Sequence, residues 1–132
     1  QLVHEVIKPA LDNKEIVICD RFVHSSYAYQ GVARGIGIDL VKSVNEIAMN
    51  GLYPDIIFFL DIKPEEVLER RNRRSNQDRI EQESISFHEK VYEGYKYMVK
   101  NKYKNIYSID GTLSKQDIFE TIINIINENW PK

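Results

Sequence analysis

The sequence contains a single cysteine, Cys19, among its 132 residues. One cysteine excludes an internal disulfide and suits a reducing compartment, so we expect a cytoplasmic protein. No apolar run approaches the roughly 18 residues of a membrane span, and no signal peptide is recognisable. Positive charge is not in excess either, because 18 basic and 20 acidic residues give a net charge of −2. We therefore expect neither a membrane protein nor a binder of nucleic acid polymers.

Two further absences concern the start of the chain and phosphate binding. The chain begins with Gln1, not with methionine, and a helical pattern of apolar residues starts at once, so we interpret the chain as a fragment. No glycine is followed by lysine anywhere in the sequence. The loop Gly-x-x-x-x-Gly-Lys-Ser/Thr, which cradles nucleotide phosphates, is therefore missing.

Three short apolar runs alternate with helical patterns along the chain. The runs cover residues 15–20, 56–61 and 106–110, and they are too short and too uniformly apolar for helices or half-exposed strands. We predict that each is a buried strand of an open parallel α/β sheet flanked by helices, with Cys19 as a buried structural thiol. Three strands make a thin sheet, which again indicates a missing part of the domain.

Helical patterns occupy residues 2–11, 39–50, 64–74, 86–104 and 114–126. Pro9 would kink the first of these helices. Gly51 would end the second, and Ser86 with Glu89 could form a capping box that opens the fourth. Residues 75–83 are polar without periodicity, which is typical of a loop.

Charged residues follow each predicted strand, at Asp20-Arg21, Asp61 and Asp110-Gly111. Ligands of open parallel sheets bind beyond the carboxyl ends of the strands, so we expect a site at this edge. Each aspartate could instead merely cap the helix that follows it, and this alternative stays open.

The segment from Asp20 to Gly31 carries the most informative pattern. Arg21 could present its planar guanidinium to a phosphate, while Asp20 could orient hydrated Mg²⁺ or the arginine. Ser26, Tyr29 and Gln30 are spaced so that one face of a helical turn could carry all three. The amide of Gln30 matches the donor and acceptor on the imide edge of thymine. The pattern predicts a nucleoside monophosphate pocket.

The order of these motifs resembles the thymidylate kinase family. The resemblance extends over essentially all 132 residues and includes Asp20-Arg21-Phe22, Ser25-Ser26-x-x-Tyr29-Gln30-Gly31-x-x-Arg34-Gly35, Gly51-Leu52-Tyr53-Pro54-Asp55, Leu60-Asp61, Asp78-Arg79-Ile80-Glu81-Gln82-Glu83, Phe87-His88-Glu89 and Asp110-Gly111. It implies a P-loop NTPase-like fold with three of the family's five strands present. It also implies one partial nucleoside monophosphate kinase domain over residues 1–132, with a lid at about residues 75–83.

By this resemblance the protein is a kinase that transfers a phosphoryl group from ATP to dTMP, giving dTDP for dTTP biosynthesis. Mg²⁺ would be the cofactor and the full-length protein a homodimer. Arg21 would hold the dTMP phosphate, and Asp20 would bind Mg²⁺ through water. Ser26 and Gln30 would contact thymine and Tyr29 the sugar. Arg34 matches a further pocket residue whose contact stays unassigned.

The resemblance also implies a donor side. Asp110 and Gly111 would lie in the loop that surrounds the adenine of ATP. Arg74 and Arg79, in or beside the lid, would neutralise charge on the transferred phosphoryl group. For Arg74 a solvated helix end is an equal alternative, and we prefer that interpretation for Arg70 and Arg71. His24 is expected at the surface or beside the site and not as a base, whereas His4 and His88, which lack the spacing of metal ligands, are expected to be structural.

Alternatives to this function remain. In the family the phosphate-binding loop lies upstream of the position equivalent to Gln1, so we expect the fragment alone to be inactive. Another P-loop nucleotide or deoxynucleoside kinase is possible, although Gln30 and the Ser25-Ser26 pair argue against a purine acceptor. A non-catalytic nucleotide-binding domain is the third reading. The apolar stripe of residues 39–50 could be core or a dimer interface.

Overall fold

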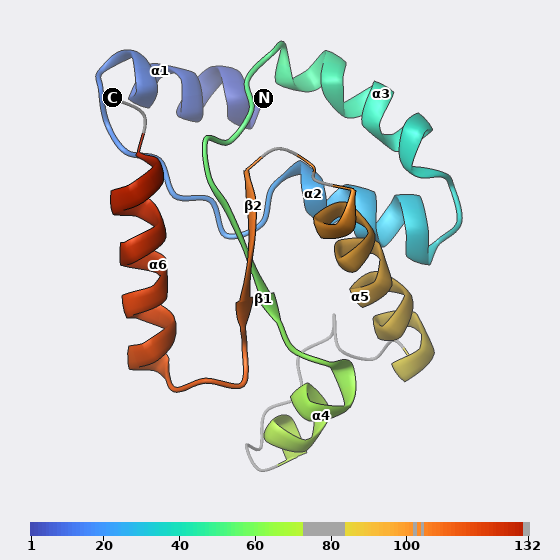
Figure 1. Ribbon diagram of the computed structural model, residues 1–132. Coiled ribbons are helices and arrows are strands. Elements are labelled where there is room, and N and C mark those ends of the chain that lie inside the picture. The colour runs from blue at the N-terminus through green and yellow to red at the C-terminus, as the bar shows by residue number, and fades with distance from the viewer. Residues whose placement is uncertain (73–83, 102, 104, 131–132) are drawn as a thin grey trace. The chain divides into compact units, whose positions relative to one another are not determined.

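A computed structural model describes residues 1–72, 84–101, 103 and 105–130, apart from the side chains of residues 71 and 72. The chain divides into two compact units, Gln1–Tyr53 and Pro54–Lys132, and the two are described separately below (Figure 1). Among the described residues, no helix has the length and apolar character needed to cross a membrane.

The first unit is helical. Its elements are the π-helix η1 (Val3–Ile7), α1 (Lys8–Asp12), α2 (Val23–Ser26), the π-helix η2 (Tyr27–Ala33) and α3 (Ile38–Met49). The disturbance predicted at Pro9 coincides with the change from η1 to α1, where the proline stands in the first turn of α1.

Helix η2 packs closely against α3 in this unit. Gly31 permits the approach, since a Cβ atom there would lie 3.1 Å from the Cα atom of Ile38. Tyr27 and Ala28 of η2 are fully buried, and Val41 of α3 is buried as well. At its other end α3 stops where Asn50 adopts a left-handed conformation, directly before Gly51. The predicted end of this helix is thus confirmed.

The first predicted strand does not form. Residues 15–19 are in neither helix nor strand, and they pair with no strand of the described residues. Ile16 and Ile18 are 70% and 91% exposed, and Cys19 is exposed instead of buried. An extended segment gains its hydrogen bonds from a neighbouring strand, and without that neighbour it gains nothing from being a strand. The described residues therefore contain two strands, not the three that were expected.

The second unit is an α/β structure. Its elements are β1 (Ile57–Asp61), α4 (Pro64–Asn72), α5 (Ile85–Lys100), β2 (Ile106–Asp110) and α6 (Lys115–Asn129). The strands pair in parallel, from Ile57 opposite Ile106 to Asp61 opposite Asp110. These two predicted strands and their parallel arrangement are confirmed.

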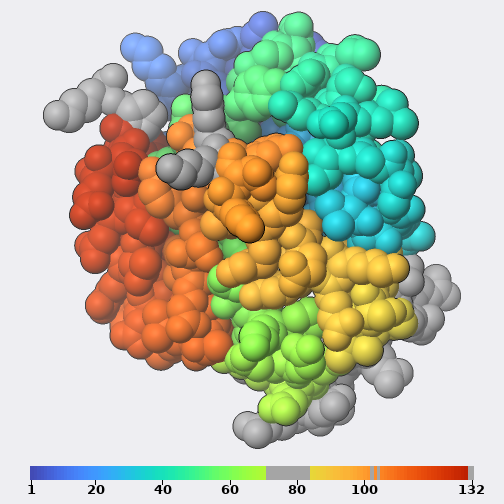
Figure 2. All heavy atoms as spheres, turned by 45° about the vertical axis from the view of Figure 1, so that its right-hand side comes forward, coloured from blue at the N-terminus to red at the C-terminus, as the bar shows by residue number. Residues whose placement is uncertain are grey.

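Helices α5 and α6 pack on the strands, and Figure 1 shows them on opposite sides of β2. Val91 and Met98 of α5 and Ile109 of β2 are buried, and the ring of Phe59 stacks on that of Tyr95 with 5.1 Å between centroids. Figure 2 shows atoms of α4 against those of α5, in agreement with their packing. Helices on both sides of a parallel sheet are the arrangement that uniformly apolar strands require.

Serine residues cap both long helices of this unit. Ser114 accepts a hydrogen bond from the backbone N–H of Asp117 at the start of α6. At the start of α5 the cap is Ser84, which accepts from the N–H of Phe87. The predicted capping box at Ser86 is wrong, because the extended backbone that a cap requires occurs at Ser84, two residues earlier.

Candidate functional site

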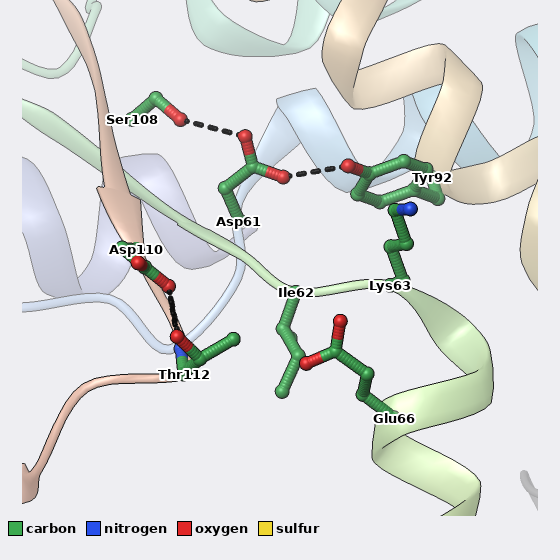
Figure 3. Close-up of a pocket in the computed structure, with 8 residues that line it drawn as sticks. All are labelled: Asp61, Ile62, Lys63, Glu66, Tyr92, Ser108, Asp110 and Thr112. Atoms are coloured by element: carbon green, nitrogen blue, oxygen red, sulfur yellow. Dashed lines mark hydrogen bonds between the residues drawn. The ribbon is translucent and has the colours of Figure 1, made fainter.

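The carboxyl ends of β1 and β2 border a pocket of about 340 Å³ (Figure 3). Parallel register brings Asp61 and Asp110 side by side at this edge. The lining residues are Asp61, Ile62, Lys63, Glu66, Tyr92, Ser108, Asp110 and Thr112. The pocket therefore lies where the sequence predicts a site, and its lining is mostly polar.

Three hydrogen bonds hold the carboxylate of Asp61. Lys96 Nζ donates to Oδ2 at 2.6 Å, Tyr92 Oη donates to Oδ1 at 2.7 Å, and Ser108 Oγ donates to Oδ2 at 3.2 Å. Burial alone would raise the pKa of Asp61. The hydrogen bonds and the positive charge of Lys96 outweigh it, so the pKa of Asp61 lies below its ordinary value.

The partners of Asp61 respond in the opposite sense. The hydrogen bond to Asp61 raises the pKa of Lys96 and also raises the pKa of Tyr92. At neutral pH these shifts favour a charged Asp61, a charged Lys96 and a neutral Tyr92. Tyr92 and Lys96 lie one turn apart on α5, so their bonds to Asp61 tie this helix to the strand ends. We call these four residues the Asp61 clamp: Asp61, Tyr92, Lys96 and Ser108.

Asp110 organises the turn after β2. Its Oδ1 atom accepts from the backbone N–H of Thr112 at 2.8 Å and from the hydroxyl of Thr112 at 2.6 Å. These bonds from Thr112 lower the pKa of the exposed Asp110. Gly111, between them, is buried, and a Cβ atom there would lie 3.0 Å from the Cβ atom of Ile62. The turn is thus fixed with its backbone close to β1.

Arg70 joins α4 to the same turn. Its guanidinium donates to the carbonyl oxygen of Gly111 at 3.0 Å and to that of Thr112 at 3.2 Å. Arg70 is exposed near the end of α4, as the interpretation of a solvated helix end predicts, and its planar fork in addition meets two adjacent carbonyls.

The other predicted site residues lie in the first unit, around Arg21. This residue is exposed and has a positive φ of 69°, which is uncommon outside glycine. Its guanidinium carbon lies 5.5 Å from the centroid of the Tyr29 ring, within the range of a cation–π contact. The structure thus brings Arg21 and Tyr29 together.

Ser26, Gln30 and Arg34 follow along the same helical segment. Ser26 ends α2, Gln30 lies in η2, and Arg34 caps η2, with its N–H bonded to the carbonyl oxygen of Tyr29 at 3.0 Å. Ser26 and Tyr29 are half-buried, whereas Gln30 and Arg34 are exposed. The turn is wider than the α-helical turn that the spacing predicts. The backbone hydrogen bonds of η2 join residues five apart, as in a π-helix, instead of four apart.

Asp20 differs from the strand-end aspartates of the second unit. It is exposed and makes no hydrogen bond or ion pair with a described residue. Mg²⁺ in proteins usually binds one or two carboxylates and keeps several waters. The oxygens of Asp20 are open to such a hydrated ion, whereas those of Asp61 are occupied. The donor chemistry of Asp20 therefore fits the expected metal.

His24 lies on the same segment. Burial lowers the pKa of its imidazole, and its ring meets the ring of Tyr27 edge-on, with 5.4 Å between centroids. The half-buried His24 packs within the unit. Arg74 and Arg79 lie outside the described residues.

The Asp61 clamp was not foreseen from the sequence. Its signals were a strand-end aspartate and the spacing of Tyr92 and Lys96, four residues apart on a predicted helix. Such a pair faces one side of the helix. The sequence alone, however, does not state which strand that side meets.

Comparison with known proteins gives consistent matches. A sequence model described as thymidylate kinase matches residues 1–122. A thymidylate kinase of Finegoldia magna is 48% identical over 126 residues, covering 96% of this chain and 62% of the relative. One of Thermoanaerobacter sp. (strain X514) is 48% identical over 128 residues, covering 97% and 63%. One of Staphylococcus haemolyticus is 44% identical over 131 residues, covering 95% and 64%. The chain spans less than two thirds of the length of these relatives.

Proposed function

Because the chain belongs to the thymidylate kinase family, we propose that its protein transfers a phosphoryl group from ATP to dTMP, giving dTDP for dTTP biosynthesis. The observation that supports this most is the segment from Asp20 to Gln30, where an exposed arginine stands beside a turn that carries Ser26, Tyr29 and Gln30. The family match includes this whole segment. The activity is proposed for the product of the complete reading frame.

In this proposal Arg21 binds the phosphate of dTMP. A guanidinium offers paired N–H donors that match two phosphate oxygens, and charge-assisted bonds of this kind are strong. Asp20 holds Mg²⁺ through water, and the ion supplies positive charge against the phosphates of ATP. Phosphoryl transfer depends mainly on positioning and on charge stabilisation, so these two neighbouring residues carry complementary tasks.

The helical segment after Arg21 binds the nucleoside. Gln30 is exposed and can offer both its amide donor and its acceptor to the imide edge of thymine, with Ser26 as a second polar contact. Tyr29 would pack against the sugar, and Arg34, exposed at the end of η2, would be a further contact of dTMP.

The donor side lies at the strand ends of the second unit. The turn of Asp110 and Gly111, fixed by Thr112 and Arg70, would lie beside the adenine of ATP. Arg74 and Arg79 would neutralise charge on the transferred group. Their roles rest on the resemblance alone.

Three further features complete the proposal. Residues 1–132 alone are inactive, because they contain no glycine-rich loop with a lysine for the ATP phosphates. The protein is a homodimer through α3, where Leu40, Val44 and Ile47 are 59%, 62% and 83% exposed on one face. It works in the cytoplasm, where the exposed Cys19 would stay reduced.

A comparison of acceptors tests the function. The purified product of the complete reading frame would be supplied with ATP, Mg²⁺ and, in turn, dTMP, dUMP, dCMP and dGMP, and kcat/KM would be measured for each. We expect dTMP to give the highest value. A preference for another acceptor would overturn the substrate, and the absence of turnover with all four would overturn the enzyme. Gln30→Leu, which keeps a similar volume, should lower kcat/KM for dTMP about tenfold or more, because it leaves the thymine edge unpaired.

A further inference from the structure

Arg21 has a backbone conformation that needs support from its surroundings. Its φ of 69° lies in the left-handed region, where a non-glycine residue is held at a cost. The side chain is exposed, so burial does not hold it. The contact that the structure shows for its guanidinium is the ring of Tyr29.

Tyr29 is well placed to give this support. Its ring centroid lies 5.5 Å from the guanidinium carbon of Arg21, and its residue is half-buried in η2. The backbone of η2 is fixed there, because the Tyr29 carbonyl accepts from the N–H of Arg34 and the preceding Tyr27 and Ala28 are fully buried. A π-helix of this kind is itself frequent at functional sites. The Tyr29 ring therefore projects from a packed helical segment and contacts the exposed guanidinium of Arg21.

We infer that Tyr29 is a positioning residue for Arg21: its ring holds the guanidinium ready for the phosphate of the nucleotide. The phosphate part of this inference rests on the proposed function. The contact with the guanidinium is distinct from the sugar contact that the family resemblance implies for Tyr29. An arginine that is ordered before the ligand arrives loses less conformational freedom on binding, and this is the physical gain.

The expected size follows from the strength of such contacts. Exposed cation–π pairs contribute enough to change an equilibrium about two- to fivefold. Loss of the ring should therefore weaken binding of a phosphate-bearing ligand by this factor through Arg21. Loss of the ring should have no effect through Arg21 on a ligand that lacks the phosphate.

The first measurement needs no ligand. In the product of the complete reading frame, the δ-methylene protons of Arg21 should show an upfield ring-current shift in NMR spectra. Tyr29→Phe should keep this shift and Tyr29→Leu should abolish it. If Tyr29→Leu does not fold, Arg21→Met, at an exposed position, should move the ring resonances of Tyr29 instead. Identical Arg21 shifts in the wild type and in Tyr29→Leu, or unmoved Tyr29 resonances in Arg21→Met, would overturn the contact.

The second measurement separates positioning from the sugar contact. Dissociation constants for dTMP and for thymidine, which lacks the phosphate, would be measured by titration calorimetry for the wild type, Tyr29→Phe and Tyr29→Leu. Tyr29→Leu should weaken the binding of dTMP about two- to fivefold more than the binding of thymidine. Tyr29→Phe keeps the ring and should therefore show no such extra loss for dTMP. In the Arg21→Met background, Tyr29→Leu should weaken the binding of both ligands equally. Equal losses for both ligands, or additive effects with Arg21→Met, would overturn the positioning role.

The two measurements fail in different ways. If the wild type binds neither dTMP nor thymidine, the proposed function is wrong, while the NMR shift still decides whether Tyr29 holds Arg21. If the wild type binds dTMP but the three predictions for Tyr29 fail, the function stands and the positioning role is wrong.

Discussion

Asp20 and Asp61 both follow apolar runs of β-branched or aromatic residues, and the sequence predicts the same place for both, at the end of a buried strand. The structure treats them differently. Asp61 ends a true strand, and its carboxylate is occupied by Lys96, Tyr92 and Ser108. Asp20 follows a segment that is not a strand, is exposed and has no hydrogen-bonding partner among the described residues.

This difference separates a stabilising carboxylate from an available one. The Asp61 clamp uses the charge of Asp61 to hold α5 against the strand ends, so that carboxylate has little capacity left for a ligand. Asp20 and its neighbour Arg21 contribute little to the packing of the first unit and remain free to act on a ligand. A strand-end aspartate is therefore not by itself evidence for a site, and its partners decide its role.

The largest expected effect is on catalysis and concerns Arg21. In the product of the complete reading frame, Arg21→Ala should lower kcat/KM for dTMP by about 10²–10³, as the loss of one charged group aimed at reacting phosphates commonly does. Lys8→Ala, which removes a positive charge from α1, serves as the matched control and should stay within about twofold. A decrease of less than threefold in Arg21→Ala would mean that the exposed arginine is not part of the machinery.

A smaller effect should distinguish the two aspartates by stability. Asp61→Ala removes three hydrogen bonds to a charged group, so the free energy of opening of β1 and β2 should fall by about 2 kcal/mol. This is less than the sum of three such bonds, because water can hydrate Lys96 and Ser108 in the variant. Asp20→Ala should change the stability of its own unit by less than about 0.5 kcal/mol. Hydrogen exchange with mass spectrometry, on peptides of each unit, measures both. Equal effects would remove the contrast between the two carboxylates.

The smallest effect is the order in which the units weaken on acidification. The folded-state pKa of His24 lies below 6.5, so its contribution is fully present above pH 6.5 and is lost as the pH falls through the folded-state value. The pKa of Asp61 lies below 3.8, so the clamp is intact above pH 3.8 and is lost only below it.

Hydrogen exchange, corrected for the intrinsic pH dependence of the rate, should therefore show the segment around η2 weakening below pH 6.5 while β1 and β2 stay protected. His24→Gln should remove the early loss. Simultaneous weakening of both regions above pH 4 would contradict the assignment of the two groups.

The sequence predicts local features well and non-local ones poorly. The strands at residues 57–61 and 106–110, the end of α3 before Gly51 and the start of α6 near Ser114 follow from composition and period. Residues 15–19 carry the same apolar signal as the true strands. A strand also needs a partner, and no property of the segment itself reports whether one is present.

The site shows the same limit. The sequence indicates Asp61 and Asp110 at one sheet edge, because parallel register follows from alternating strands and helices. It does not indicate that Tyr92 and Lys96 reach Asp61, or that Arg70 reaches two carbonyls of the next turn, because these contacts depend on how the helices pack. The pairing of Arg21 with Tyr29 depends on the unusual backbone at Arg21, which no residue type predicts.

The most direct test is a crystal structure of the product of the complete reading frame with dTMP bound. The account predicts a phosphate oxygen within hydrogen-bonding distance of the Arg21 guanidinium and the thymine edge against the Gln30 amide. A dTMP molecule bound instead at the Asp61–Asp110 edge, with Arg21 turned to solvent, would contradict it.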